Sequence, residues 1–222
     1  MTTLFLSDKK CFACGTTSRY PLIDLTLKIT GSRDLDGRPS HIQRSLVYLW
    51  IQRCTSCGYC APEIAKGDLN DLSLIKSSEN QSILSDLEYP ETACAFRSHS
   101  LTMEKKGQFA DAGWAQLCAA WVCDDNKYES SSVECRKSAL VLFSKAKQSG
   151  QEFSQSNVEE NVYIIDILRR VAQFGHALKL CLIELDKENT DHVLDLLEFE
   201  KYLIEKRESS CHSEAEAEEF EL

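Results

Sequence analysis

Two short runs decide the fold of the N-terminal third of this chain: Cys11-Phe12-Ala13-Cys14-Gly15 and Cys54-Thr55-Ser56-Cys57-Gly58. Each run is C-x-x-C followed at once by glycine, and this spacing places two sulfur atoms on one tight turn. Structural zinc sites take four soft ligands at the corners of a tetrahedron, and thiolates suit them. The two runs therefore predict one structural Zn²⁺ held by four thiolates, those of Cys11, Cys14, Cys54 and Cys57.

Cys60 leaves a second pairing open, because Cys54, Cys57 and Cys60 together read C-x-x-C-x-x-C. Gly58 repeats the position that Gly15 has in the first run, where the backbone suits glycine, and this favours the Cys54/Cys57 pair. A redox or iron–sulfur role is the lesser alternative, since no βαβ pattern surrounds either run. A closed four-thiolate site offers no open coordination position, so we expect it to stabilise the fold and not to catalyse.

The composition argues against several classes of protein. The formal net charge of the 222 residues is −10, and it is carried by residues 91–222, because residues 1–90 hold ten basic and ten acidic side chains. Binding to nucleic acid over the whole surface needs clustered Lys and Arg, so it is not expected. No apolar run approaches the roughly 20 residues that span a bilayer, and residues 1–10 do not resemble a signal peptide. The eleven cysteines, an odd number, suit reduced thiols, so we expect a soluble cytoplasmic protein with no membrane association.

The segment between the two cysteine runs is rich in strand signals. Residues 21–30 alternate apolar and polar side chains, which predicts a half-buried strand, and residues 46–52 form an apolar, β-prone run. A loop of turn residues, 31–40, separates them. This order predicts a β-hairpin that brings both cysteine turns to the same end, as in a small zinc ribbon.

The loop between these strands concentrates charge within six residues: Arg33, Asp34, Asp36 and Arg38. One interpretation is a polar recognition loop near the zinc end of the hairpin. The other is a salt-linked loop that has no binding role. The residue pattern leaves both open.

From about Glu91 the apolar period becomes helical, and it predicts helices over residues 96–106, 109–123, 132–147, 158–171, 174–185 and 191–206. Residues 106–112 and 171–177 resemble each other, because each joins two helices with a phenylalanine at the turn and a small residue three positions later. Helix pairs of this kind are typical of tetratricopeptide repeats. The two copies are 65 residues apart and not 34, so an irregular helical bundle is the alternative.

These patterns together predict an α+β chain in three parts. They are a β zinc ribbon with its hairpin and linker over residues 1–90, an all-α, tetratricopeptide-like domain of helical hairpins over residues 91–207, and an acidic disordered tail over residues 208–222. The tail prediction rests on six glutamates and no Lys or Arg among the last fifteen residues.

Four stretches resemble a known group of proteins: Arg33-Asp-Leu-Asp-Gly-Arg-Pro39, Trp50-Ile-Gln-Arg-Cys-Thr-Ser-Cys-Gly-Tyr-Cys-Ala-Pro62, Ala119-Ala-Trp-Val-Cys-Asp-Asp125 and Ile165-Asp-Ile-Leu-Arg-Arg170. They are similar to uncharacterised bacterial proteins that pair an N-terminal zinc ribbon with tetratricopeptide-like helices and are classed only as a domain of unknown function. The resemblance covers about residues 8–190. It implies the architecture and zinc ligation by Cys11, Cys14, Cys54 and Cys57, but no activity.

Three functions are compatible with these observations. The first is a zinc-stabilised interaction or adaptor protein, whose helical hairpins bind a protein or peptide partner. The second is a nucleic-acid-binding zinc ribbon with a local basic face made of Arg19, Arg33, Arg38, Arg44 and Arg53. The third is an enzyme that uses the Arg33–Arg38 loop, although we find no catalytic motif to support it.

Overall fold

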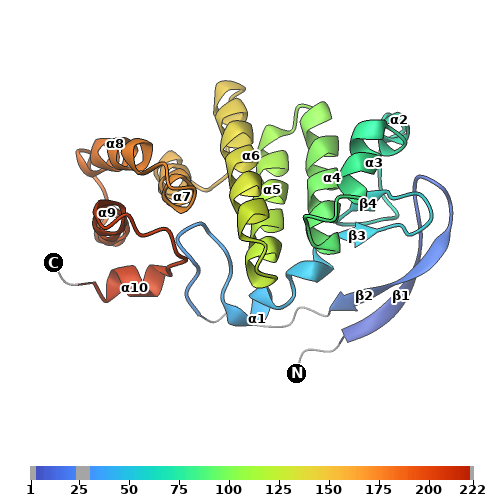
Figure 1. Cartoon of the computed structure of the whole chain (residues 1–222), viewed down its shortest axis with the longest axis horizontal. Coiled ribbons are helices and arrows are strands. Elements are labelled where there is room, and N and C mark those ends of the chain that lie inside the picture. The colour runs from blue at the N-terminus through green and yellow to red at the C-terminus, as the bar shows by residue number, and fades with distance from the viewer. Residues whose placement is uncertain (1–3, 24–30, 221–222) are drawn as a thin grey trace.

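The computed structural model describes residues 4–23 and 31–220, and most of this described chain is helical (Figure 1). The N-terminal part holds two small antiparallel hairpins, β1–β2 and β3–β4, and several short helical turns. Its elements are, in chain order, β1 (Leu4–Lys10), β2 (Thr17–Ile23), α1 (His41–Arg44), the 3-10 turn η1 (Val47–Leu49), β3 (Gln52–Arg53), β4 (Cys60–Ala61), α2 (Asp71–Ile75) and α3 (Ser78–Leu84). The α+β class predicted from the sequence is confirmed.

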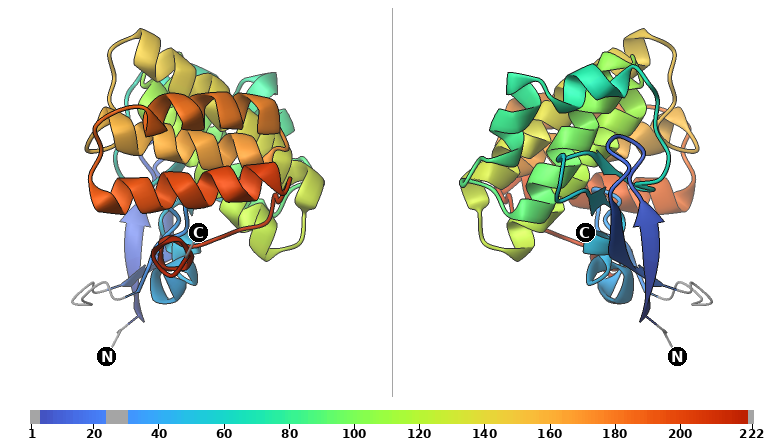
Figure 2. Two further views of the ribbon diagram at one scale, coloured as in Figure 1. Left: turned by 90° about the vertical axis from the view of Figure 1, so that its left-hand side faces the viewer. Right: turned by 90° about the vertical axis from the view of Figure 1, so that its right-hand side faces the viewer.

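The longer helices form two groups of three, in which helices that follow each other in sequence pack side by side (Figure 1). The first group is α4 (Glu91–Lys105), α5 (Phe109–Asp125) and α6 (Glu129–Gln148). The second is α7 (Asn157–Arg170), α8 (Phe174–Leu185) and α9 (Asp191–Glu205). Figures 1 and 2 show that α7–α9 run across the direction of α4–α6, with α6 against α7 at the junction. No helix within residues 4–23 and 31–220 is both long and apolar enough to cross a membrane.

The turn that the sequence predicts to recur has one backbone geometry at three short helix–helix connections, and the ends of α6, at Gly150, and of α9, at Arg207, have it too. Gly107, Lys127 and Ala172 follow α4, α5 and α7, and they have left-handed φ values of 73°, 63° and 59°. In each turn the next residue donates its backbone N–H to the carbonyl five residues earlier, which closes the end of the helix. The likeness of residues 106–112 to residues 171–177 therefore reflects a shared helix-ending turn, which the α5–α6 connection also uses.

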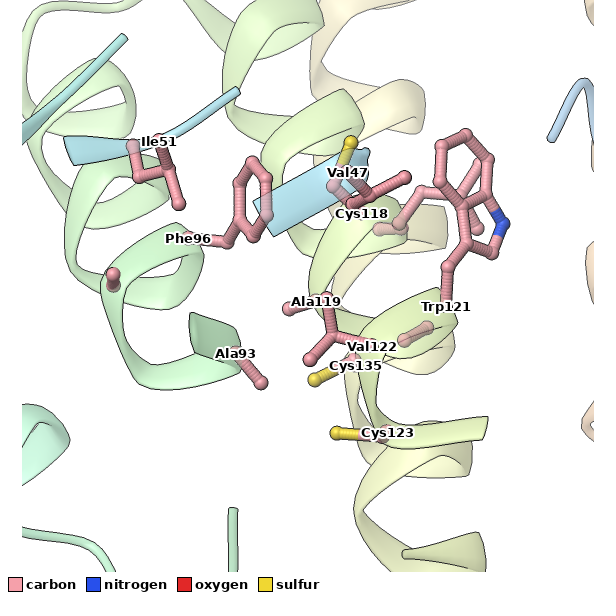
Figure 3. Close-up of a cluster of buried hydrophobic side chains, with 14 of the residues drawn as sticks. Val47, Ile51, Ala93, Phe96, Cys118, Ala119, Trp121, Val122, Cys123 and Cys135 are labelled. Atoms are coloured by element: carbon pink, nitrogen blue, oxygen red, sulfur yellow. The ribbon is translucent and has the colours of Figure 1, made fainter. Parts of the chain in front are cut away.

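The core of the first helix group is built from small side chains on facing helices (Figure 3). Ala93, Ala119 and Ala139, on α4, α5 and α6, are each fully buried, so the helix backbones approach closely and larger side chains fill the flanks. Val47 and Ile51 from the N-terminal part join this core, as Figure 3 shows. The core thus extends across residue 90, where the sequence pattern suggested a domain boundary.

The predicted strand over residues 46–52 is wrong for most of its length. Residues 47–49 form the 3-10 turn η1, and strand pairing starts only at Gln52. Val47 and Ile51 are both buried in the core of the first helix group, and this burial against the helices overrides the local β preference. Of the predicted strand over residues 21–30, the first three residues belong to β2, and residues 24–30 lie outside the described part of the chain.

The expectation of disorder from Ser209 onward is also wrong for residues 209–220. This segment returns to the loop at residues 31–38, where the N–H of Leu35 donates to His212 O at 3.0 Å. It then forms α10 (Glu214–Glu218), which starts with a capping box between Ser213 and Glu216 and buries Ala217 against α9.

Candidate metal centre

Each C-x-x-C run forms the turn of its own hairpin, so the predicted layout of one hairpin with both turns at one end is corrected. Cys11–Cys14 joins β1 to β2, and Cys54–Cys57 joins β3 to β4. In both turns the glycine N–H donates to the carbonyl of the first cysteine, at 2.9 Å for Gly15 and 2.8 Å for Gly58. These glycines have φ values of +75° and +79°, which other residues adopt only with strain. The two turns therefore share one backbone conformation.

The two turns bring together the four predicted ligand residues. The Sγ atoms of Cys11, Cys14, Cys54 and Cys57 all lie within 4.8 Å of one another. Across the two hairpins, Cys11 Sγ is 3.8 Å from Cys57 Sγ, and Cys14 Sγ is 3.6 Å from Cys54 Sγ. A tetrahedral thiolate centre with metal–sulfur bonds of about 2.3 Å has sulfur–sulfur edges of about 3.8 Å. The cluster is compatible in donor type, number and spacing with one metal ion.

Cys60, the alternative ligand, lies outside this cluster. Its side chain is 2% exposed and belongs to the core of the first helix group. Its sulfur lies 3.4 Å from the carbonyl oxygen of Gly58, and burial raises the pKa of its thiol to about 12. The choice of Cys54 and Cys57 over Cys57 and Cys60 agrees with this geometry.

The surroundings set the acidity of the cluster thiols unevenly. Burial raises the pKa of Cys11 and Cys57, although backbone N–H groups of their own turns point at both sulfurs. Hydrogen bonds from the side chain and backbone of Thr16 lower the pKa of Cys14 to about 6. A metal ion has to displace protons from the buried thiols, so its apparent affinity rises with pH.

A few contacts besides the cluster hold the two hairpins together. The N–H of Phe12 donates to Ile64 O at 3.0 Å, and the Lys9 ammonium lies 2.7 Å from the Glu63 carboxylate. The Tyr20 hydroxyl donates to Arg53 O at 3.3 Å, between the first hairpin and the second. Two-stranded hairpins are marginally stable in water, so a metal ion bound at their junction would contribute a large share of the stability of this region.

The predicted recognition loop lies elsewhere in the molecule. Figure 1 shows the loop on the far side of α5 and α6 from the cysteine hairpins, so it is not near the zinc end as the sequence suggested. Asp34, Asp36 and Arg38 are 5%, 0% and 3% exposed, and only Arg33 is open to solvent. The salt-linked interpretation of the loop agrees with this burial, and the recognition interpretation does not.

Asp36 is the centre of a buried ring of charges that consists of Asp36, Asp124, Arg136 and Arg170. Both arginines bridge both carboxylates, with the four N···O distances between 2.7 and 3.3 Å. Burial raises the pKa of Asp36, but the guanidinium groups of Arg170 and Arg136 outweigh it, and the pKa of this carboxyl lies below its usual value. The ring is neutral, and it joins the loop to α5, α6 and α7.

Three of the four sequence stretches that carry the family resemblance meet in this ring of charges. Residues 33–39, 119–125 and 165–170 supply Asp36, Asp124 and Arg170, which meet although they are far apart in sequence. Arg136 on α6 was not singled out from the sequence. A fully buried arginine on the apolar face of a helix is a signal for an ion pair, but it does not name the partner.

The arginines proposed as a local basic face are all paired with carboxylates. Arg19 pairs with Asp8, Arg33 with Glu159 and Glu214, Arg38 with Asp125, Arg44 with Asp34, and Arg53 with Glu91. Arg33, Arg38 and Arg44 lie around the loop at residues 31–38, whereas Arg19 lies on β2 and Arg53 on β3. Each guanidinium group has a carboxylate beside it, which lowers the local positive charge that binding to phosphates needs.

Comparisons with known proteins add nothing to these observations. No protein-family model, no curated protein and no solved structure matches this chain. The resemblance to bacterial zinc-ribbon proteins with tetratricopeptide-like helices therefore stays a prediction.

Proposed function

We propose that this protein is a zinc-stabilised interaction protein whose helical hairpins bind an acidic, amphipathic segment of a partner protein. The observation that carries the proposal is a groove of about 590 Å³ along the junction between α6 and the α7–α8 turn. Its apolar floor is formed by Leu140, Val141 and Leu168, and Val141 is 56% exposed. Apolar grooves between helices are a common site for an amphipathic partner helix.

The charge around the groove favours an acidic partner. Lys137 and Lys145 stand at its edges, and none of the described residues that line it is acidic. Their own ion pairs, with Glu134 and Glu104, are partly exposed, and such pairs contribute little free energy, so both ammonium groups can attract a partner. The chain as a whole has a net charge of −10, so the positive charge at this groove differs from the overall charge of the protein.

The metal centre has a structural role in this proposal. Four thiolates complete the coordination of Zn²⁺, so no position is left for a substrate or a water molecule. The ion would hold β1–β2 against β3–β4, and β4 in turn contacts α4. The alternatives receive less support, since the arginines of the proposed basic face are paired with carboxylates, and Asp34, Asp36 and Arg38 of the proposed catalytic loop are buried.

Photo-crosslinking from the groove tests the proposal. Benzoylphenylalanine at position 141 should form a covalent adduct with a partner protein in the cells that express the chain. The partner peptide in this adduct should be acidic, with apolar residues at helical spacing. Position 87, where the native leucine is 90% exposed and distant in sequence from the groove, is the matched control and should give no such adduct.

A charge reversal completes the test. The double variant Lys137→Glu, Lys145→Glu should abolish the adduct from position 141 while the far-ultraviolet circular dichroism spectrum stays unchanged. Equal adducts from positions 141 and 87, or an adduct that survives the charge reversal, would contradict the proposal.

A further inference from the structure

An unusual share of exposed apolar surface lies on the first hairpin and beside it. Among the described residues, twelve large apolar side chains are exposed, and five of them belong to β1 or to the turn around η1. Leu4, Phe5 and Leu6 are consecutive in β1 and are 50%, 47% and 62% exposed. Isolated exposed apolar residues are normal, but here three follow one another on one strand, with Leu4 and Leu6 on one face of the hairpin and Phe5 on the other.

β1 also has a free edge. In the described part of the chain it pairs with β2 alone, and β2 lies against η1. Figures 1 and 2 both show β1 as the outermost strand, with β2 between it and the rest of the molecule. The N–H and C=O groups on this outer edge are therefore available to another strand.

The two halves of β1 differ in the charge of their side chains. The second half carries charges that are engaged within the chain, because Asp8 pairs with Arg19 and Lys9 pairs with Glu63. The first half, Leu4–Leu6, carries neither a charge nor a proline, the usual features that keep an exposed strand edge from pairing. The Cys11–Cys14 turn follows Lys10, at the opposite end of the strand, so it does not cover these residues.

We propose that the edge of β1 pairs with β1 of a second copy of this chain, antiparallel and around a two-fold axis at Phe5. The two hairpins then form one four-stranded sheet. In this register Phe5 lies opposite Phe5 of the second copy, and Leu4 lies opposite Leu6 of the second copy. Every described apolar residue of the edge meets an apolar residue.

The sequence of β1 disfavours the registers in which the axis is displaced toward its charged half. An axis at Leu6 sets Leu4 against Asp8, and an axis at Ser7 sets Leu4 against Lys10 and Phe5 against Lys9. Both place a charge opposite an apolar side chain, and Lys9 and Asp8 would also have to leave their present partners. A shift by one residue also moves each side chain to the other face of the sheet, so the register is well defined.

The expected dimer is reversible. An edge contact of a few residues belongs to the small class of interfaces, so the dimer should depend on protein concentration. It also extends a two-stranded hairpin, which is marginal by itself, to four strands. The inference is independent of the groove between α6 and α7–α8.

Sedimentation velocity on the zinc-loaded full-length chain tests the proposal. The wild type should shift from monomer to dimer as its concentration is raised. Phe5→Lys and Phe5→Glu should each remain monomeric, because each sets like charges against one another at the axis. An equimolar mixture of the two should recover the dimer, since opposite charges then face each other, and this recovery is specific to an axis at position 5.

The control variant is Leu87→Glu, which removes an exposed apolar residue elsewhere and should dimerise as the wild type does. Zinc content and circular dichroism show that the Phe5 variants are folded. A wild type that stays monomeric at every concentration, a dimer that survives in Phe5→Lys, or a mixture that fails to recover the dimer would overturn the proposal.

Discussion

Trp121 Nε1 donates a hydrogen bond to Asp36 Oδ2 at 2.9 Å, across 85 positions of sequence. The same carboxylate oxygen accepts from Arg136 and Arg170, so one side chain of a loop contacts α5, α6 and α7. These helices belong to both groups. Asp36 is fully buried, and together with Asp124, which also pairs with Arg170, it links the two helix groups.

Asp36→Asn should destabilise the whole chain. The substitution keeps the shape of the side chain but leaves Arg136 and Arg170 buried with one counter-charge fewer. Removing one partner from a buried ion network costs about 3–5 kcal/mol. Urea unfolding followed by circular dichroism measures the loss in the free energy of unfolding.

The matched control for this substitution is Asp8→Asn. Asp8 pairs with Arg19 on the surface, where both side chains are more than half exposed. Exposed pairs are worth at most about 1 kcal/mol. Similar losses in the two variants would show that the ring of charges does not hold the helix groups together.

Acid should weaken the fold through Asp124. Burial raises the pKa of Asp124, but Arg136 and Arg170 outweigh it and hold it at about 2, against 3.8 in the unfolded chain. A lowered pKa gives stability that is complete above the unfolded value and is lost as the pH falls through the folded value. Unfolding free energy measured from pH 5 to pH 2 should therefore fall by about 2 kcal/mol more in the wild type than in Asp124→Asn.

Glu200→Gln should be tolerated, although Glu200 is fully buried. Burial and the nearby Asp166 carboxylate raise the pKa of Glu200 well above its usual value, although Arg169, which donates to this carboxyl at 3.0 Å, opposes the shift. A raised pKa gives stability that is present at low pH and is lost as the pH rises through the folded value. The amide cannot ionise, so the variant should lose less stability than the wild type as the pH rises.

The comparison for Glu200 is Glu205→Gln on the exposed face of α9. In this control, the melting temperatures at pH 6, 8 and 9 should follow the same pH dependence as those of the wild type. If Glu200→Gln lowers the melting temperature at every pH, the buried side chain is ionised and the account of this site is wrong.

Removing the C-terminal segment should lower stability. A chain that ends at Glu208 loses α10, the buried Ala217 and the hydrogen bonds of residues 210–215 to Arg169 and to the loop at residues 32–35. A chain that ends at Phe220 keeps them and is the control. We expect a lower melting temperature and faster amide exchange at Leu35 in the shorter chain, whereas equal melting temperatures would restore the view of a disordered tail.

The sequence predicts the two cysteine turns and the longer helices, because local residue patterns determine these elements. The spacing of Cys11, Cys14, Cys54 and Cys57, with a glycine after each pair, fixes two equal turns wherever the surrounding strands lie. The helices after Glu91 follow from a periodicity that holds over many turns. The tail was misjudged on composition alone, although Ser213 and Glu216 form a capping-box pattern that the sequence displays.

The rest depends on partners that are distant in sequence. Residues 33–38 look like a solvated charged loop, because the groups that bury Asp36 follow 85 to 134 positions later. Residues 46–52 look like a strand, because the helices that bury Val47 and Ile51 come after Glu91. Local sequence rules do not predict the structure of either segment, because each structure is determined by burial against helices that come later in the sequence.

The central claim is that Cys11, Cys14, Cys54 and Cys57 hold one structural metal ion. Elemental analysis of the purified chain, together with the visible spectrum of its Co²⁺-substituted form, tests it most directly. We predict one zinc per chain and a tetrahedral thiolate spectrum, both lost in Cys54→Ser, where the N-terminal hairpins should melt while much of the helix remains, and both retained in Cys60→Ser. A chain that binds no metal, or that keeps its metal in Cys54→Ser and loses it in Cys60→Ser, would contradict the account.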